Sequence, residues 1–262
     1  MTDTVLEQLP LWETMGTITL DEMDSIKLMN RIDTKFVTNR TRLLDILEEA
    51  AAQGYRVNVI DGHTVQGYNS VYYDTESLQM FTAHRCGKKT RQKVRVRTYL
   101  SSGDTFLEIK RKKNNGRTKK KRIALPAEFA MDFGKSAEAS AFLEAKSWWK
   151  TAELSPEVST TFKRITLVNA SKTERLTIDS SLKFENFRNG NKADLKDCVI
   201  IELKQDGRAE SEMKSILLSH RVFPFRVSKY CMGVCLTQPE LPKGRFKMKI
   251  RYIEKQINTE LI

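Results

Sequence analysis

Charged and apolar residues alternate along four separated stretches of this chain: residues 31–35 (RIDTK), 91–97 (RQKVRVR), 108–112 (EIKRK) and 202–204 (ELK). Successive side chains of a β-strand point to opposite faces, so the charges of each stretch share one face. The residues between them, such as Val94 and Val96, are apolar enough to be buried. The pattern predicts strands with an apolar face and a strongly cationic face that also carries a few carboxylates. Such strands, closed into a barrel, would pack their apolar faces against helices and leave a polar lumen.

The remaining pattern predicts a mixture of strands and helices. Strands are expected over residues 31–38, 55–60, 67–73, 91–100, 105–113, 117–125, 159–170, 174–187 and 197–204, with turns at 61–62, 101–104 and 114–116. Helices are expected over residues 17–29, 126–150, 209–219 and 228–237, and from a cap at Asn39 or Thr41 to Ala52. Residues 243–251 alternate again, which fits either one more strand or a solvated basic tail. The chain has no internal repeat or low-complexity linker, so a single α+β domain is the simplest expectation.

The overall charge favours anionic partners. The 262 residues carry a formal net charge of +12, and the sequence pI is about 9.5. This charge favours nucleic acid, anionic lipid or polyphosphorylated ligands. No Lys or Arg precedes Lys27, so the start of the chain lacks the basic segment of a secretory signal, and no apolar run approaches the ~18 residues of a transmembrane helix. We therefore expect a cytoplasmic protein.

The cysteines and histidines do not form a recognisable site. They are Cys86, Cys198, Cys231, Cys235, His63, His84 and His220. No paired CxxC motif or histidine cluster is present, so zinc is not expected, and ordinary thiols in a reducing compartment explain the cysteines. The scattered histidines are better explained as packing or surface residues than as catalytic bases. The chain also lacks the GxxxxGK[ST], GxGxxG and kinase catalytic-loop motifs, so any nucleotide chemistry must use another architecture.

The strand over residues 91–97 gives the clearest chemical signal. Its cationic face carries Arg91, Lys93, Arg95 and Arg97. A solvated outer face is the alternative, but like charges in line repel one another, and the sequence offers no equally acidic strand to balance them. Arginine donates bidentate hydrogen bonds to phosphate oxygens, and lysine adds a point charge. The pattern therefore favours an anion-binding face.

Carboxylates recur among these cations at one spacing. Glu108 and Lys110 stand two residues apart, as do Glu202 and Lys204, and cross-strand ion pairing would explain either pair alone. Next to a phosphate-binding face they indicate a triphosphate held together with Mg²⁺ or Mn²⁺, because these cations prefer carboxylate oxygens. Asp33 and Asp179 are further candidates, either for the metal or for orienting lysines.

Other elements are expected to add ligands for an anion. Arg164 lies in a later strand, and Arg226, Ser228 and Lys229 stand at the start of a helix whose capped N-terminus suits a phosphate. The run 119–122 (KKKR) adds charge, but alternation alone leaves open whether its even-numbered members, including Lys120, or its odd-numbered members face inward.

Taken together, these motifs resemble the VTC domain, which is the polyphosphate polymerase domain of the triphosphate tunnel metalloenzyme superfamily. The motifs are RIDTKF (31–36), YYDT (72–75), KVRVRTY (93–99), LEIKRK (107–112), RLTID (175–179), IELK (201–204) and SKY (228–230). The resemblance covers about residues 25–236 and leaves 237–262 as a basic C-terminal extension. The first strand lacks the Glu-x-Glu-x-Lys opening of the related cyclases and thiamine triphosphatases, which fits the polymerase branch.

The resemblance implies an eight-stranded antiparallel β tunnel, closed as a barrel with flanking helices, that binds a triphosphate and Mn²⁺ or Mg²⁺. Catalytic members of the family transfer phosphate from ATP to a polyphosphate chain and release ADP. The residues expected in catalysis are Lys35, Arg95, Arg97, Lys110 and Glu202, with Glu202 as the metal ligand. Motif matches and residue pattern together predict the other phosphate-binding residues as Arg31, Lys93, Lys120, Arg164, Arg175, Lys204, Ser228 and Lys229. The residue pattern adds Glu108 and Asp179 as candidate metal ligands.

Two other functions stay open. A tripolyphosphatase would use the same site with water as acceptor, and a polyanion-binding module would bind polyphosphate or RNA without turnover. RNA binding would favour exposed aromatic residues between the basic ones, but Val and Ile stand there, so no specific nucleic-acid partner is expected. Eukaryotic relatives are fused to SPX and membrane domains, and we expect neither here. A separate membrane protein is therefore a candidate partner.

Overall fold

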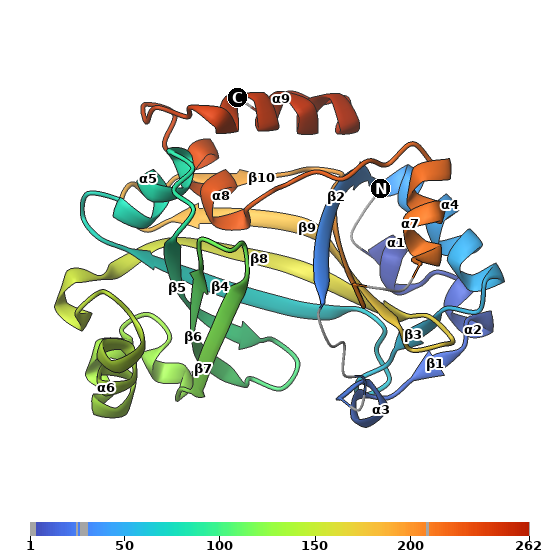
Figure 1. Ribbon diagram of the computed structural model, residues 1–262, viewed down its shortest axis with the longest axis horizontal. Helices are drawn as coiled ribbons and strands as arrows, with labels where there is room; N and C mark the ends of the chain where they lie inside the picture. Colours follow the sequence, from blue (N-terminus) through green and yellow to red (C-terminus); the bar gives the residue numbers. More distant parts are fainter. Residues whose placement is uncertain (1–3, 25, 27–30, 208–209, 262) are drawn as a thin grey trace.

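A large antiparallel β-sheet dominates the structure. The computed structural model describes residues 4–24, 26, 31–207 and 210–261. Eight strands follow one another in the spatial order β2-β11-β9-β8-β4-β5-β6-β7. Their bounds are β2 (Ile32–Asn39), β4 (Gln66–Asp74), β5 (Arg91–Tyr99), β6 (Thr105–Lys112), β7 (Thr118–Ala124), β8 (Ser155–Val168), β9 (Glu174–Asn186) and β11 (Cys198–Gln205). The short strands β1 (Thr17–Ile18), β3 (Arg56–Asn58) and β10 (Lys192–Asp194) pair at the margins of this path. The sheet curves, so that β2 and the β6–β7 hairpin both come forward of β8 and β9 (Figure 1).

Helices flank this sheet, and several begin at a polar cap. Their bounds are α1 (Thr4–Glu7), α2 (Leu11–Thr14), α3 (Leu20–Asp24), α4 (Arg40–Ala52), α5 (Gln79–Arg85), α6 (Ala137–Lys146), α7 (Glu212–Ser219), α8 (Lys229–Thr237) and α9 (Arg245–Ile257). The side chains of Asn39, Ser136, Ser211 and Ser228 each accept a hydrogen bond from the backbone N–H three residues later. Each cap satisfies a donor that the first turn of a helix leaves unpaired.

Apolar side chains cover the outer face of the sheet on two sides. On one side, Phe36 of β2, Leu43 of α4 and Ile216 of α7 belong to one buried cluster. On the other side, Val94 of β5 and Leu143 of α6 are both completely buried. Burying one such side chain contributes about 1.5–3 kcal/mol, so these clusters stabilise the curved sheet from outside. The polar inner face is left for the lumen.

Hydrogen bonds do not close the sheet into a barrel, which corrects the expected closed tunnel. Strands β2 and β7 lie at opposite ends of the strand order, and no pairing joins them within the described residues. The segment before α8 takes the edge of β2 instead. Phe225 donates its backbone N–H to the carbonyl of Lys35 at 2.6 Å, and Phe36 forms an isolated bridge with Pro224. This segment occupies edge groups that a pairing with β7 would require, so the fold is an α+β sheet wrapped around a lumen.

The C-terminal extension forms a helix, so both expectations for residues 243–251, a strand or a solvated tail, were wrong. Helix α9 buries Phe246, Ile250, Ile253 and Ile257, which recur at helical spacing. Residues 243–251 are too few to separate a period of 2 from a period of 3.6. Figure 1 shows α9 lying across one end of the sheet.

Three other expected helices differ in extent. Within residues 17–29, the described part forms β1 and α3, and residues 25 and 27–30 lie outside the described residues. Within residues 126–150, two short 3-10 turns (Ala127–Phe129 and Phe133–Lys135) precede α6. The helix expected from residue 209 begins at Glu212, and residues 208–209 are not described. Within the described residues, no helix is both long and apolar enough to span a bilayer.

Candidate functional site

The register of the sheet decides which charged side chains face the lumen. Directly opposed residues of antiparallel strands lie on the same face. Glu108 of β6 stands opposite Arg95 on one side and Arg122 on the other, and Lys110 stands opposite Lys93 and Lys120. The even-numbered members of the run 119–122 therefore face inward. The luminal set of β5, β6 and β7 is Lys93, Arg95, Arg97, Glu108, Lys110, Lys120 and Arg122.

Strands β2, β11, β9 and β8 supply the facing wall. Lys35 stands opposite Glu202, Lys204 opposite Arg175, and Asp179 opposite Arg164. Helix α8 adds Ser228 and Lys229 from one end. The luminal set of this wall is Lys35, Arg164, Arg175, Asp179, Glu202, Lys204, Ser228 and Lys229. Cations greatly outnumber carboxylates on the two walls together.

Glu108 is the most buried carboxylate of the lumen, with 1% of its side chain exposed. Its Oε2 lies 2.5 Å from Arg95 Nη2, and its Oε1 lies 3.0 Å from Lys120 Nζ. Burial alone would raise the pKa of Glu108, but the charges of Arg95 and Arg97 outweigh burial and hold the pKa below its ordinary value. Both carboxylate oxygens are therefore engaged with cations.

Asp179 is engaged in the same way on the facing wall. Arg164 donates to its two oxygens from Nε at 2.6 Å and from Nη2 at 2.8 Å, and Lys229 Nζ donates to Oδ2 at 2.6 Å. Burial would raise the pKa of Asp179, but Arg164 and Lys229 lower it well below its ordinary value. Lys229 also lies 3.0 Å from the centre of the Phe162 ring. This carboxylate orients two luminal cations and keeps no free oxygen.

Glu202 differs from both because one of its oxygens is open. Its Oε1 accepts a hydrogen bond from Lys35 Nζ at 2.7 Å, while Lys204 Nζ lies 4.0 Å from Oε2. Burial would raise the pKa of Glu202, but Lys35 and Lys204 hold it below its ordinary value. The pKa of Lys204 is itself lowered to about 8, chiefly by burial. Glu202 is thus an ionised carboxylate with 22% of its side chain exposed.

Arg97 is a buried cation without a carboxylate partner among the described residues. It is 8% exposed, donates from Nε to Ser70 Oγ at 3.1 Å, and lies over the rings of Tyr68 and Phe162. Burial and the charges of two neighbouring arginines lower the pKa of Arg97 to about 10. Because no described carboxylate forms an ion pair with this guanidinium, it favours the binding of an anion.

Lys110 is a second luminal cation without a carboxylate partner among the described residues. It takes part in no ion pair within the part of the chain that the structure describes. The charge of Arg95 and then burial lower the pKa of Lys110 well below its ordinary value. Nearby, Lys93 donates from Nζ to Ser228 Oγ at 2.7 Å, and burial lowers the pKa of Lys93 too. The lumen therefore stores positive charge that its own carboxylates do not neutralise.

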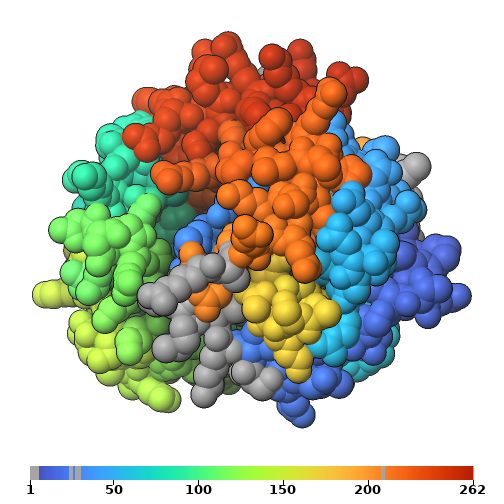
Figure 2. All heavy atoms as spheres, turned by 45° about the vertical axis from the view of Figure 1, so that its right-hand side comes forward, coloured from blue at the N-terminus to red at the C-terminus, as the bar shows by residue number. Residues whose placement is uncertain are grey.

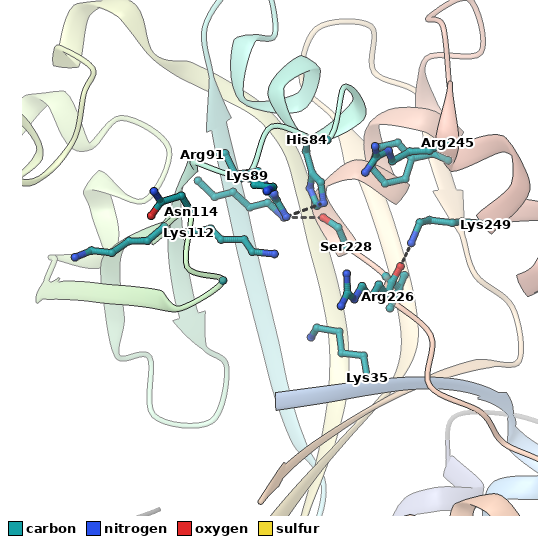
Figure 3. Close-up of a pocket in the computed structure, with 16 residues that line it drawn as sticks. Lys35, His84, Lys89, Arg91, Lys112, Asn114, Arg226, Ser228, Arg245 and Lys249 are labelled. Carbon is teal, nitrogen blue, oxygen red and sulfur yellow. Dashed lines mark hydrogen bonds between the residues drawn. The ribbon is translucent and has the colours of Figure 1, made fainter. Parts of the chain in front are cut away.

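A cavity of about 470 Å³ opens at one end of the lumen. We call it the basic mouth. The space-filling view shows a hollow between the β6–β7 region (green) and the segment before α8 (orange), below α9 (red) (Figure 2). Figure 3 shows side chains from several elements converging on this cavity. Its cationic lining residues are Lys35, Lys89, Arg91, Lys93, Lys112, Lys113, Arg226, Arg245 and Lys249.

The structure brings almost all predicted site residues into the lumen. Arg31 is the exception, because it precedes β2, is exposed, and pairs with Asp33 at 2.6 Å. The sequence pattern does not place Arg245 and Lys249 in the basic mouth, because the alternation over residues 243–251 predicts a strand or a solvated tail. The helical recurrence of apolar residues through Ile257 is the signal that could have placed them.

Residues 30–238 match the VTC domain. The chain belongs to the VTC domain family. This confirms the resemblance to the VTC domain. The matched part of this VTC domain protein runs from just before β2 through α8 and ends before α9.

Solved structures resemble this VTC domain at low sequence identity. A putative adenylyl cyclase from Hippeastrum, described as having a dominant triphosphatase activity, is 11% identical with a TM-score of 0.54. The likeness covers 82% of the VTC chain and 99% of that chain. A putative adenylate cyclase from Vibrio parahaemolyticus is also 11% identical, with a TM-score of 0.46 and coverage of 79% and 99%. No curated protein matches the VTC chain. Identity this low shows the fold alone.

The resemblance to triphosphate tunnel metalloenzymes implies a divalent metal, and one luminal carboxylate fits it. Among the described residues, no group of three or more His, Cys, Asp or Glu forms a protein cage for a metal. The oxygens of Glu108 and Asp179 are engaged with cations, whereas Oε2 of Glu202 accepts no hydrogen bond from a described residue. Mg²⁺ is commonly held by one or two carboxylates together with substrate phosphates and water. Glu202 therefore fits a metal shared with a bound triphosphate, and the contacts of the other two do not favour that role.

Proposed function

We propose that this VTC domain is a metal-dependent phosphoryl transferase that uses ATP as donor and a polyphosphate chain as acceptor. The observation that carries the proposal is the cationic lumen, in which Arg97 and Lys110 have no carboxylate partner among the described residues. A bound triphosphate would supply the negative charge that balances these two cations. Family membership over residues 30–238 supports phosphoryl transfer as the use of that charge.

The luminal residues divide into two groups in this proposal. We place one group around the transferring phosphoryl group. This group contains Glu202, the candidate metal ligand, and Arg97 and Lys110, which have no carboxylate partner among the described residues. Its members are Lys35, Arg95, Arg97, Lys110 and Glu202. The other group holds the remaining phosphates and orients the residues of the first group. Its members are Lys93, Lys120, Arg164, Arg175, Lys204, Ser228 and Lys229, with Arg31 outside the lumen as a peripheral charge.

The reaction needs no covalent bond to the protein. A terminal phosphate oxygen of the acceptor chain attacks the γ-phosphorus of ATP. The bond between that phosphorus and the bridging oxygen then breaks, and ADP leaves with the electron pair. Arg97 and Lys110 neutralise charge on the transferring group and hold it in line, which is the main demand of phosphoryl transfer. When bound at Glu202, Mg²⁺ or Mn²⁺ supplies further positive charge to the phosphate oxygens.

A tripolyphosphatase is the second candidate function. It would use the same lumen, with water in place of the acceptor chain. The Hippeastrum protein favours this candidate, because it shares the fold at a TM-score of 0.54 and is described as having a dominant triphosphatase activity. A non-catalytic polyphosphate-binding module would need only the cationic lumen and is the third outcome of the test.

Product analysis after incubation with ATP separates these candidates. Purified protein is incubated with ATP and Mn²⁺ or Mg²⁺, and the products are run on a polyphosphate-stained gel beside assays for ADP and free phosphate. A ladder of long chains with ADP release supports the polymerase. Free phosphate without chains supports the hydrolase, and tight tripolyphosphate binding without turnover supports the binding module. Absence of both binding and turnover contradicts a phosphate-binding lumen.

We also propose a cytoplasmic protein with a separate membrane protein as partner. The charge pattern and the membrane domains of eukaryotic relatives support this part of the proposal. Affinity purification of the tagged chain from membranes of its own cells tests it. Co-purification of one membrane protein supports the partner, and recovery of the chain alone counts against it.

A further inference from the structure

The basic mouth contains positive charge that the luminal triphosphate does not use. Arg245 and Lys249 come from α9, outside the region that matches the VTC domain, and both line the cavity together with Arg91 and Arg226. We propose that these four residues form a second anion subsite. It binds the part of a linear polyphosphate that extends beyond the phosphates held in the lumen. This inference rests on the proposed function of the lumen, and it adds that α9 makes binding depend on chain length.

The packing of α9 directs the two side chains into the mouth. Phe246 is buried beneath the helix, which fixes how the helix is rotated about its axis. Arg245 and Lys249 stand four residues apart, so they lie along one edge of α9, and both line the cavity. Lys247 and Arg251 also stand four residues apart but are exposed and do not line the cavity. One helix thus carries two similar pairs of cations with different surroundings.

The backbone around the mouth accommodates Arg245 and Lys249. Gly87 adopts a φ of +75°, and a Cβ at this position would overlap the Arg245 guanidinium. Glycine suits this left-handed backbone, and its missing Cβ leaves room for the arginine in the position that it holds here. Lys249 Nζ donates a hydrogen bond to the carbonyl of Arg226, which draws the two residues together in the mouth (Figure 3).

A neutral histidine holds Arg91 in the mouth. Arg91 donates to the carbonyl of Lys88 at 2.7 Å, and its Nη2 lies 3.4 Å from His84 Nε2. A guanidinium can only donate, so His84 Nε2 accepts and the ring proton is on Nδ1, which lies 3.1 Å from Cys231 Sγ. Burial lowers the pKa of His84 to about 2, so the ring stays neutral. Arg91 is thereby oriented by two acceptors and keeps its other N–H groups for a ligand.

The mouth is continuous with the lumen. Lys35 and Lys93 line the cavity and also belong to the luminal walls. No carboxylate is among the described residues that line the cavity. A linear polyphosphate repeats its negative charge at every phosphate, so a chain held in the lumen presents its next phosphates to the mouth. In this proposal the three phosphates of a triphosphate lie in the lumen, so only a longer chain reaches Arg245 and Lys249.

Binding measured against chain length tests the subsite. Isothermal titration calorimetry gives the Kd of tripolyphosphate and of a long linear polyphosphate at several salt concentrations. The test variant is Arg245→Gln/Lys249→Gln, and the matched control is Lys247→Gln/Arg251→Gln, which removes the same charge from the same helix. We expect the test variant to weaken binding of the long chain about tenfold or more relative to tripolyphosphate, because contacts with charged groups are lost. Its salt dependence for the long chain should also become shallower.

Each other outcome overturns a stated part of the argument. Equal losses for both ligands, or a loss no larger than that of the control, would overturn the α9 subsite and leave the lumen standing. Wild-type protein that binds neither ligand would overturn the lumen and the subsite together. Thermal unfolding of both variants is measured alongside. If the test variant unfolds early, the same comparison is made with Arg245→Lys and Lys249→Arg, which keep the charge and should restore the preference for long chains.

Discussion

Replacing Arg97 by methionine is expected to stabilise the ligand-free protein, even though it removes a proposed phosphate ligand. The Arg97 guanidinium is buried, and its hydrogen-bond partner is the neutral Ser70 hydroxyl. Burial removes the hydration of the charge, and no carboxylate among the described residues forms an ion pair with it, although Glu108 acts on it at longer range. Methionine keeps an apolar stem against the Tyr68 and Phe162 rings without the charge.

The magnitude follows from the pKa. Burial lowers the pKa of Arg97 from 12.5 to about 10. Each pKa unit corresponds to about 1.4 kcal/mol, so the charged form is destabilised in the folded protein by about 3 kcal/mol. Because the folded-state pKa lies below the unfolded one, this cost is fully present below pH ~10 and is relieved only above it. The lost hydrogen bond to Ser70 offsets about 1 kcal/mol, which leaves a net gain of about 2 kcal/mol.

Thermal unfolding without ligand checks this gain. A change of 1 kcal/mol shifts the melting temperature by about 2–4 °C for a chain of this size, so Arg97→Met should melt about 4–8 °C above wild type. Arg164→Met is the matched control. Arg164 is also a buried luminal arginine, but it donates two hydrogen bonds to Asp179. Breaking that buried pair should destabilise the protein by about 3–5 kcal/mol.

Tripolyphosphate should reverse the order of wild type and Arg97→Met. A ligand at 100 times its Kd stabilises a folded protein by ~2.7 kcal/mol, and the variant should lose most of this because it lacks the arginine. A melting temperature of ligand-free Arg97→Met below that of wild type would refute the view that Arg97 is an uncompensated charge. An unchanged response to tripolyphosphate would refute its role as a phosphate ligand.

Four further predictions concern the lumen and its support. Glu202→Gln and Lys35→Ala should each abolish turnover of ATP. Each should change the free energy of unfolding by no more than about 1 kcal/mol, because both side chains are partly exposed. Activity retained in both variants would contradict the proposed site. Triphosphate affinity should fall as the pH rises above 8, because the pKa of Lys204 is lowered to about 8 and the free protein loses this charge above that pH. Calorimetry on Lys204→Arg should give a flatter pH profile, and an equally steep one would assign the pH dependence to another group. EDTA should stop turnover but leave the melting temperature of the ligand-free protein unchanged, because Glu202 alone fits the metal; a lower melting temperature would indicate a structural metal. Asp74→Asn should destabilise the protein by about 1–3 kcal/mol in urea unfolding, because the fully buried carboxylate accepts hydrogen bonds from several backbone N–H groups and from Tyr230, and an amide would set a donor against a donor.

Local alternation predicted which side chains face the lumen. Val94 is completely buried on the outer face, and Arg95 and Arg97 lie on the luminal face, as the period of a strand requires. The run 119–122 could not be oriented from its own sequence, since every member is basic. Its orientation depends on the pairing with β6, in which Lys120 stands opposite Lys110. Periodicity within one strand cannot supply that register.

Features that depend on distant segments were beyond the sequence pattern. The hydrogen bond from Phe225 to Lys35 occupies part of the β2 edge, and the sequence around neither residue predicts it. His84 and Cys231 meet although 147 residues separate them. Helix α9 differs for another reason, because residues 243–251 are too few to separate a strand period of 2 from a helical period of 3.6. The fold class and most luminal residues therefore followed from local pattern and motif order, while closure and the basic mouth followed from tertiary contacts.

Strand β7 has a consequence for how copies of the protein behave toward one another. Within the described residues it pairs only with β6, and almost all of its residues are exposed. A free strand edge is a template for intermolecular pairing and aggregation. The basic run 119–122 places positive charge on both faces of this edge, so two copies brought edge to edge repel each other. The same lysines that attract a polyanion thus keep the molecule dispersed, and substitutions that neutralise them would make it prone to aggregate.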